Sequence, residues 1–537
     1  MAYVITQNCC KDGSCIPVCP VDCIRPAAAA GEFTATEQLY IDPETCIDCG
    51  ACMEECPVDA IHYEDDLPVE LARFTDINAA YFRRHPLEPG AVPAPRPHPP
   101  VPAGALRVAI VGAGPAACYA AAELVAVDGV EVNVFERLPT PFGLIRAGVA
   151  PDHQHTKSVV GAFEHAFSGP RVACYLNVQV GEQLHHDELM AHHHAVIYAV
   201  GAADSRALGI PGETLPGSHP AAEFVGWYNG HPDHAGHRFD LAGRRAVIVG
   251  NGNVALDVAR VLLMGPDALA TTDVAAHALT ALAHSSIDEV VILGRRGIRD
   301  SAFSVGEFLA LGHLPGVDVV LDGADLTAGL DDDVETTVKL DLAREYAQRA
   351  PTPGHKRIVF RFLVSPSEIV GSERVEGLRV VAGDDAEPEL IETALVLRSI
   401  GYRGAAIPGL PHDHGRGVVP NADGRVLGAD GAPVPGVYVT GWIKRGPRGV
   451  IGTNRTCAEQ TVAALLADFD DGTLTRALPD PAELSQLLTR RGARPLTWRD
   501  WQNIDRSERR RGAELSRPRL KFVSVPEVLA LADADSA

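Results

Sequence analysis

The sequence has little positive charge and no long apolar run, and both absences exclude classes of protein. It holds 47 Lys and Arg against 70 Asp and Glu, which gives a net charge of −23. Nucleic acid requires a basic surface to neutralise its phosphates, so nucleic-acid binding is excluded. The longest uncharged candidate, 108–122, is interrupted by two glycines and a proline and is shorter than the ~20 residues of a membrane span. The first residues show no basic start followed by an apolar stretch, so we expect a cytoplasmic protein.

Cysteine is nearly absent beyond residue 56. Nine of the twelve cysteines lie within residues 1–56, and only Cys118, Cys174 and Cys457 follow. A cytoplasmic chain does not rely on disulfides, so this crowding indicates ligation of a metal or a cluster. Residues 1–66 also hold thirteen acidic residues against Lys11 and Arg25. This acidity fits a solvated face, and it fits equally an electron carrier that is steered towards basic partners.

The cysteine spacing favours iron–sulfur clusters over zinc. Cys46, Cys49, Cys52 and Cys56-Pro57 match the C-x2-C-x2-C-x3-C-P run of bacterial ferredoxins, in which the fourth cysteine ligates the other cluster. Zinc sites use two separated cysteine pairs instead. Cys19-Pro20 has the same form as Cys56-Pro57, so Cys19 should complete the cluster ligated by Cys46, Cys49 and Cys52.

The other predicted cluster has a less regular set of ligands. Its candidates are Cys15, Cys56 and one or both of Cys9 and Cys10. With three thiolates a cubane readily loses one iron, so both [4Fe-4S] and [3Fe-4S] remain open. We interpret Cys23 as a small buried residue.

Two glycine loops predict two dinucleotide sites. The first is a G-x-G-x-x-A fingerprint over Val111–Ala117, which includes Gly112, Gly114 and Ala116, and it follows an apolar strand and opens a helix. Glu136 ends the next strand, where an acid binds ribose hydroxyls. The helix N-terminus offers amide donors to the pyrophosphate. The strand that begins at Arg107, the helix 115–127 and the strand 131–136 form an alternating α/β pattern.

The second loop repeats this pattern at Gly250, Asn251, Gly252, Asn253 and Val254. The next strand ends in Arg295 and Arg296 in place of an acid, which favours the 2′-phosphate of NADP over the hydroxyl of NAD. The gap between loop and arginines is long, so we expect the intervening segment to extend the helix.

Several longer strings resemble a known family. From about 107 to 470 the chain is similar to adrenodoxin reductase, and as a whole it resembles actinobacterial ferredoxin/ferredoxin–NADP reductase fusions. The strings that carry the resemblance are 111–117, 140–153 (TPFGLIRAGVAPDH), 250–260 (GNGNVALDVAR), 294–297, 399–402 and 441–451 (GWIKRGPRGVI).

The resemblance implies an α/β flavoprotein with FAD and NADP Rossmann-like domains behind an N-terminal α+β ferredoxin-like domain. It implies hydride transfer from NADPH to FAD, then single-electron transfer to the clusters of its own ferredoxin domain, to an external ferredoxin, or to both. It implies FAD contacts at Glu136, Leu144, Val180, Trp442, Gly449, Val450 and Ile451. It implies NADP contacts at Asn251–Val254, Arg295, Arg296, Glu307 and Gly449, and places His153 and Asp257 near the flavin as coupling or proton-relay residues.

We expect six segments: a two-cluster unit at 1–66, a linker at 67–104 that is proline-rich from 86, the two parts of the FAD domain at 105–203 and 393–468, the NADP domain at 204–392, and a helical extension at 469–537. The linker would let the N-terminal unit approach the flavin and then present itself to a partner.

Two other functions remain open, namely an electron-input subunit of a larger enzyme such as glutamate synthase, and a non-catalytic electron carrier. The sequence does not specify the oligomeric state. We interpret the histidines at 185–186 and 192–194 as structural rather than metal-binding, and expect the basic stretch 506–519 to pack against nearby acids.

Overall fold

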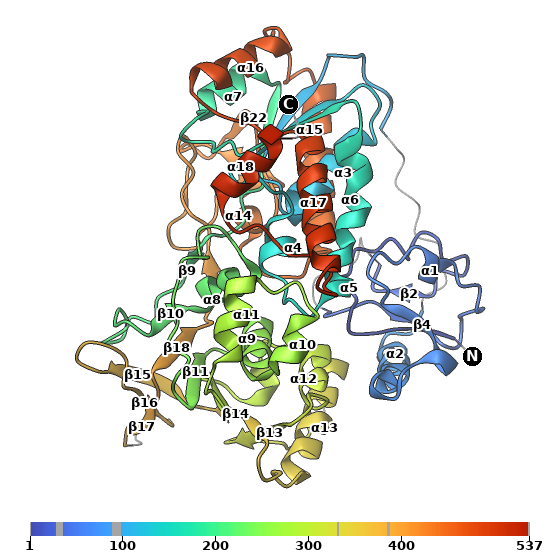
Figure 1. The fold of residues 1–537 in the computed structure, drawn as a ribbon. Helices are drawn as coiled ribbons and strands as arrows, with labels where there is room; N and C mark the ends of the chain where they lie inside the picture. The colour runs from blue at the N-terminus through green and yellow to red at the C-terminus, as the bar shows by residue number, and fades with distance from the viewer. Residues whose placement is uncertain (1, 28–35, 88–97, 330–331, 384–386, 535–537) are drawn as a thin grey trace.

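The computed structural model describes residues 2–27, 36–87, 98–329, 332–383 and 387–534, and Figure 1 shows them as three lobes. Two lobes are built on sheets flanked by helices, and the third is the small N-terminal unit, residues 2–66. This confirms the predicted α/β fold with a separate N-terminal unit. Most of the proline-rich segment predicted from residue 86 falls on 88–97, outside the described residues. No helix in the described ranges is long and apolar enough to cross a membrane.

The N-terminal unit consists of two short antiparallel ladders around buried cysteines. The first ladder pairs β1 with β4, and the second pairs β2 with β3. Cys15, Cys23 and Cys52 are buried between these ladders together with aliphatic side chains. The elements are β1 (Tyr3–Ile5), β2 (Ile24–Arg25), β3 (Tyr40–Ile41), α1 (Ala51–Glu54), β4 (Ile61–Tyr63) and the 3-10 turn η2 (Glu64–Asp66).

The first part of the predicted linker is a helix within the core. After the 3-10 turn η3 (Val69–Leu71), α2 (Arg73–Arg84) buries Phe74, Ile77 and Tyr81. Each large apolar side chain buried in this way contributes roughly 1.5–3 kcal/mol. These side chains belong to a hydrophobic cluster that also holds β1, β3 and the helices of the six-stranded sheet. The N-terminal unit is therefore packed onto the rest of the chain.

The first predicted nucleotide fold forms a seven-stranded sheet in the order β20-β21-β22-β8-β5-β6-β7. The strands from β22 to β7 are parallel and nearly all apolar, as expected for strands covered on both faces. Helix α3 begins with a proline at its first position, which suits a helix start. Together with the long helix α15, which packs against it, α3 lies on one face of the sheet. The strands are β5 (Arg107–Val111), β6 (Glu131–Glu136), β7 (Val172–Leu176), β8 (Ala195–Tyr198), β20 (Asn421–Ala422), β21 (Arg425–Leu427) and β22 (Pro433–Val439), and the helices are α3 (Pro115–Val125), α4 (Gly143–Ala147), α5 (Gln154–Lys157), η4 (Ser158–Val160), α6 (Gly161–Ser168), α7 (His186–His192), α14 (Trp442–Arg445) and α15 (Thr453–Asp470).

The second predicted nucleotide fold forms a six-stranded, fully parallel sheet in the order β10-β18-β11-β12-β14-β13. A three-stranded antiparallel sheet, β15-β16-β17, is inserted between β14 and β18 along the chain, and β9 pairs with β19. The strands are β9 (Asp204–Ser205), β10 (Ser218–Pro220), β11 (Arg245–Val249), β12 (Glu289–Gly294), β13 (Val317–Asp322), β14 (Lys356–Phe362), β15 (Ser365–Val370), β16 (Gly377–Val381), β17 (Glu389–Glu392), β18 (Leu395–Arg398) and β19 (Tyr402–Arg403), and the helices are α8 (Ala221–Asn229), α9 (Asn253–Leu263), α10 (Pro266–Ala270), α11 (Ala276–Ala283), η5 (Ile298–Asp300), α12 (Val305–Leu311) and α13 (Val334–Gln348).

Two details differ from the sequence-based expectations. Strand β18 was expected to return the chain to the first nucleotide fold at 393, but it pairs with β11 in the six-stranded sheet. An apolar strand carries no signal for which of two sheets it joins. The long gap before Arg295 does not extend one helix, because Met264 adopts an extended conformation and Pro266 begins α10.

The C-terminal extension is helical, as predicted, and its basic residues pair within the chain. It consists of α16 (Pro481–Arg490), α17 (Trp498–Ala513) and α18 (Val525–Ala534). Arg509 and Arg519 each lie 2.6 Å from the carboxylate of Asp505, and Arg519 also pairs with the buried Glu508 at 3.2 Å. The expectation that the stretch 506–519 packs against nearby acids is confirmed.

Candidate functional site

A cleft of about 1050 Å³ lies where the two nucleotide folds meet the N-terminal unit. It gathers most of the residues predicted for the second loop and the flavin edge. It also includes a wall that the sequence did not predict, contributed by 7–10 and 36–38 of the N-terminal unit. The predicted site residues that line it are Cys9, His153, Gly250, Asn251, Gly252, Asn253, Val254, Asp257, Arg295, Arg296, Glu307, Trp442, Gly449, Val450 and Ile451.

The second glycine loop is a tight turn between β11 and α9. Gly250 has a φ of +107°, and a Cβ there would lie 2.2 Å from the carbonyl oxygen of Ser399. Only glycine fits this left-handed conformation and this close approach of two backbones. The side chain of Asn253 accepts a hydrogen bond from the Ser304 amide at 2.7 Å, which ties the start of α9 to the start of α12.

Arg295 and Arg296 follow β12 at the rim of the cleft, and both are exposed. Arg296 lies 3.6 Å from Asp300, and both side chains of this pair are more than half exposed. Within the described part of the chain, Arg295 makes no ion pair. Two solvated guanidinium groups at the mouth of a nucleotide loop can bind a phosphate with bidentate hydrogen bonds.

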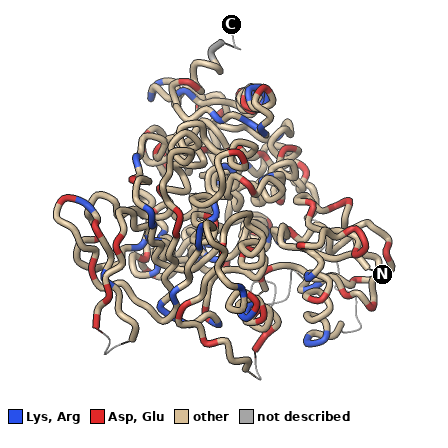
Figure 2. The backbone as a smooth tube through the Cα atoms, turned by 60° about the horizontal axis from the view of Figure 1, so that its bottom comes forward, with Lys and Arg blue, Asp and Glu red and all other residues tan. Residues whose placement is uncertain are grey.

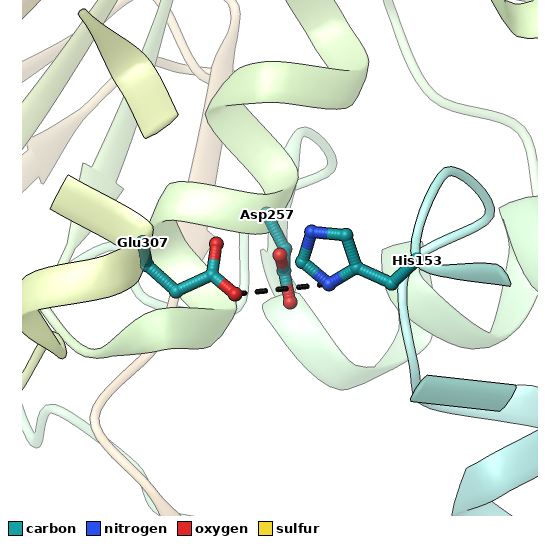
Figure 3. A group of neighbouring side chains, drawn as sticks. All are labelled: His153, Asp257 and Glu307. Carbon is teal, nitrogen blue, oxygen red and sulfur yellow. Dashed lines mark ion pairs between the residues drawn. The ribbon is translucent and has the colours of Figure 1, made fainter. Parts of the chain in front are cut away.

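Deeper in the cleft, His153, Asp257 and Glu307 converge from three separate elements, as Figure 3 shows. Arg260 on α9 connects them, and its side chain is only 4% exposed. It donates hydrogen bonds to Asp257 at 2.6 Å, to Glu307 at 3.0 Å and to Nε2 of His153 at 2.7 Å. It also pairs with Asp152 at 2.6 Å. The network therefore joins the first nucleotide fold to the second.

The contact with Arg260 fixes the tautomer of His153. A guanidinium only donates, so Nε2 of His153 is the acceptor and the ring proton of the neutral imidazole sits on Nδ1, 3.7 Å from Glu307. Burial raises the pKa of Asp257 to about 6, against the opposing effect of Arg260 and with a further rise from Glu307. Ligand atoms of His153, Asp257 and Glu307 lie within 4.8 Å of one another, the spacing of a metal site, but the guanidinium already supplies the positive charge there. The arrangement suits storage and movement of a proton.

The first glycine loop lies outside this cleft but is built in the same way. Gly112 has a φ of +104°, and a Cβ there would lie 2.6 Å from the carbonyl oxygen of Ala199. The carboxylate of Glu136 accepts hydrogen bonds from the amides of Ala113 and Leu138, both at 2.9 Å, and so supports the loop. Each of its oxygens keeps a lone pair for a further donor. The other predicted nucleotide-contact residues outside the cleft are Gly114, Ala116, Leu144 and Val180.

The segment that starts at Gly441 connects the first loop to the cleft. Gly441 has a φ of +73°, and a Cβ there would lie 2.5 Å from the Cβ of Ala116 on α3. The next residue, Trp442, lines the cleft, and its ring lies 5.6 Å from that of Tyr402. One ligand can therefore extend from the first loop to the cleft along this segment.

The cysteines of the N-terminal unit line two separate cavities. We call the cavity next to the cleft the inner cavity; its cysteines are Cys9, Cys10, Cys15 and Cys56. We call the other the outer cavity; its cysteines are Cys19, Cys46, Cys49, Cys52 and Cys23. Cys23 is buried, with its Sγ 3.4 Å from the Sγ of Cys19, to which its amide also donates. Aliphatic side chains complete both walls, and these donor sets and walls suit iron–sulfur clusters.

Cys9 and Cys10 line the inner cavity and the nucleotide cleft at the same time. The carbonyl of Cys10 accepts a hydrogen bond from the amide of Gly452 at 2.7 Å. Gly452 directly follows 449–451, the segment predicted to contact the flavin. A single turn of backbone thus separates the inner cavity from the cleft.

The predicted structural role of the histidine-rich stretch fits its contacts. His193 is fully buried, and its Nδ1 lies 2.8 Å from the Leu189 carbonyl. Nδ1 of His194 accepts from the Arg107 amide at 2.9 Å. His186 lies 2.8 Å from the Tyr198 hydroxyl. These rings serve different partners and do not share one coordination sphere.

Comparison with known proteins decides the family. The profile of the 4Fe-4S binding domain family matches 39–62, and that of the pyridine nucleotide-disulphide oxidoreductase family matches 106–271. A probable ferredoxin/ferredoxin–NADP reductase of Mycobacterium tuberculosis is 48% identical over 548 residues, which cover 99% of this chain and 95% of the relative. The chain belongs to the ferredoxin/ferredoxin–NADP reductase family.

Reductases without this full extent are also similar. The structure of Mycobacterium tuberculosis FprA in complex with NADPH aligns with a TM-score of 0.75 and 46% identity, covering 80% of this chain and 99% of that chain. A mitochondrial NADPH:adrenodoxin oxidoreductase of Arabidopsis thaliana is 38% identical over 460 residues, which cover 80% of this chain and 95% of the relative. The resemblance predicted from the sequence strings is confirmed.

In this member of the ferredoxin/ferredoxin–NADP reductase family, two features of the cleft were missed from the sequence. Arg260 ends the string GNGNVALDVAR three residues after Asp257, and this spacing places both on one helical face, so a signal was present. The Cys10–Gly452 contact joins residues more than 400 positions apart in the sequence, and no local pattern indicates it.

Proposed function

We propose that this chain is an NADPH-dependent ferredoxin reductase that holds FAD and passes single electrons to clusters in its own N-terminal unit and to an external acceptor protein. The observation that carries the proposal is the shared cleft. The arginine-tipped nucleotide loop, the flavin-edge segment and the cysteine pair Cys9–Cys10 all line it. Reductant, flavin and first acceptor would thus meet in one place.

For FAD, we assign the pyrophosphate to the first loop and the start of α3, where helix amides and small residues suit phosphate. The fit is supported by the close backbone approach at Gly112, where a side chain would collide. Glu136 would accept from the ribose. Leu144, Val180, Trp442 and the backbone of 449–451 would surround the rest of the ligand.

For NADPH, we assign the pyrophosphate to Asn251–Val254 at the start of α9. Arg295 and Arg296 would bind the 2′-phosphate, and Glu307 and Gly449 would contact the nicotinamide half. A ligand that spans these groups reaches the charged network of His153 and Asp257.

The residues of this network would hold a proton close to the redox centre. Bound FAD supplies the chemistry that converts a two-electron hydride donor into a source of single electrons. Each NADPH leaves as NADP+ and releases one proton, while two copies of a one-electron acceptor are reduced. His153 presents its Nδ1 proton, Asp257 has a pKa raised to about 6 by burial, and Arg260 keeps both oriented.

We propose one iron–sulfur cluster in each cysteine cavity. Cys19, Cys46, Cys49 and Cys52 would ligate a [4Fe-4S] cluster in the outer cavity. Cys9, Cys15 and Cys56 would ligate the inner cluster, with Cys10 on the same wall. EPR of the oxidised protein decides its nuclearity, because a [3Fe-4S] cluster gives a signal in that state and a [4Fe-4S]2+ cluster does not.

We assign the domains as predicted, with one change: the pairing of β18 with β11 favours an NADP domain that ends after 398 in place of 392. The acidic composition and the cysteine pattern favour a cytoplasmic protein whose partners are NADPH and a ferredoxin or another one-electron acceptor.

Steady-state assays with the purified holoprotein test the proposal. We expect NADPH to drive reduction of ferricyanide and of cytochrome c without any added subunit. Activity that requires a synthase subunit would favour the electron-input alternative, and absence of NADPH oxidation with either acceptor would leave only the carrier role.

A further inference from the structure

The N-terminal unit covers the flavin-edge side of the cleft with its inner cavity. In addition to the Cys10–Gly452 hydrogen bond, Arg455 donates to the carbonyl of Asp12 at 2.8 Å. At the other edge, the carboxylate of Glu37 lies 2.8 Å from Lys339 and accepts from the Val305 amide at 2.7 Å. The side of the N-terminal unit that holds the inner cavity is therefore covered by the rest of the chain, and an external protein cannot approach the inner cavity from that side.

The outer cavity faces the solvent instead. Its Cys49 is exposed, whereas the inner Cys10 and Cys15 are buried. In the sequence, two large apolar residues lie on either side of the exposed cysteine: Ile47 is 58% exposed and Met53 is 42% exposed. Apolar side chains of this size beside a redox ligand are typical of a protein contact.

The surroundings of this surface are mainly acidic, and Arg25 next to the outer cavity is paired with Asp22. The sequence contains no Lys or Arg from 26 to 72, and nine Asp and Glu lie between 42 and 66. Figure 2 shows this acidic lobe near the N-terminal label. Glu54 and Glu55 are exposed at the end of α1, and Asp65 and Asp66 are exposed after β4. A partner that fits must therefore be basic.

We propose that the outer face, defined as Ile47, Cys49 and Met53 with the surrounding carboxylates, is the docking surface for a one-electron acceptor protein with a basic surface. This inference rests on the proposed function. Electrons would pass from the cleft through the inner cavity to the outer cavity and leave there. Two acceptor molecules would be reduced for each NADPH oxidised.

Binding of cytochrome c, a basic one-electron haem protein, tests the surface. Two charge-reversed holoproteins, Glu54→Lys/Glu55→Lys and Asp65→Lys/Asp66→Lys, are compared with wild type by calorimetry at several salt concentrations. We expect a Kd increase of about 10-fold or more and a flatter salt dependence. The matched control is Asp471→Lys/Glu483→Lys, which changes the net charge equally on exposed residues of the C-terminal half. An unchanged Kd in both variants, or an equal increase in the control, overturns the proposal.

Two further readouts keep this result separate from the proposed function. Carbodiimide cross-links between cytochrome c lysines and wild-type protein should map to 42–66, and cross-links that map elsewhere contradict the surface. NADPH-dependent ferricyanide reduction and iron content are measured on every variant and should match wild type. If the wild-type protein does not reduce ferricyanide with NADPH, the proposed function is refuted. The binding and cross-linking data would still show whether the outer face is the docking surface.

Discussion

Gly452 offers a direct way to loosen the N-terminal unit from the cleft. A Cβ at this position would lie 1.9 Å from the carbonyl oxygen of Lys11 and 2.4 Å from the amide nitrogen of Asp12. Both contacts are backbone atoms that cannot rotate away. In Gly452→Ala the two backbones must separate by roughly 1.5 Å to restore an ordinary contact, which also breaks the 2.7 Å hydrogen bond to Cys10.

The cost follows from these two losses. The hydrogen bond contributes about 0.5–1.5 kcal/mol, and forced overpacking costs about 1–3 kcal/mol. Together they weaken the docking of the cysteine loop by about 2–4 kcal/mol, which corresponds to roughly 30- to 900-fold in its equilibrium constant. We expect cluster reduction by NADPH to slow by as much as this factor, because only the docked unit holds its cysteines at the cleft, whereas flavin reduction and ferricyanide turnover stay within a factor of about two.

Anaerobic stopped-flow absorbance separates the two steps, because flavin and cluster bands differ. Gly265→Ala is the matched control, since a Cβ at Gly265 meets nothing within 4 Å. It should behave as wild type. Cluster reduction in Gly452→Ala at the wild-type rate would show that electrons do not cross at this contact.

Three further predictions concern charged residues. The double variant Arg295→Ala/Arg296→Ala should raise the KM for NADPH about 10- to 100-fold, because a charged hydrogen bond to the 2′-phosphate contributes about 1.5–3 kcal/mol. The KM for NADH, which lacks this phosphate, should change little, and equal effects on both coenzymes would refute the assignment. Because the Asp257 carboxylate forms above a pKa of about 6, the pH profile of NADPH-driven flavin reduction should inflect near pH 6 and lose this inflection in Asp257→Asn; an unaltered profile would contradict the relay. Burial would raise the pKa of Asp273, but Lys157 and Lys521 hold this pKa well below its usual range. The Asp273 carboxylate therefore stabilises the native state at any pH above the pKa of an unfolded aspartate. This stabilisation is lost as the pH falls from there towards the pKa of the folded state. Asp273→Asn should cost about 3–5 kcal/mol of unfolding free energy in urea titrations at pH 7, because it leaves two buried lysines unpaired, and a loss below 1 kcal/mol would contradict this.

Local patterns determined most of the fold that could be predicted. The apolar runs of β5 and β11, each followed by a glycine turn, fix a strand and the start of a helix within a few residues. Their glycines occupy backbone conformations that other residues avoid, so the pattern has a physical cause. The cysteine spacing is similarly informative, because it reflects the reach of thiolates around one cluster.

Long-range packing could not be predicted in this way. The sheet that β18 joins, the burial of α2 and the position of the N-terminal unit depend on surfaces that meet far apart in the sequence. The proline-rich composition after residue 86 suggested an N-terminal unit that approaches and leaves, yet the contacts of Gly452 and Glu37 dock this unit on the cleft. Arg260 was overlooked for a different reason, since an arginine on a helix usually serves the surface and only the fold reveals four partners around it.

An anaerobic titration of the holoprotein with NADPH, followed by optical and EPR spectroscopy, tests the central claim most directly. We expect NADPH alone to reduce the flavin and then the N-terminal clusters of the same molecule, at a rate independent of protein concentration. Clusters that stay oxidised after complete flavin reduction, although dithionite reduces them, would contradict it.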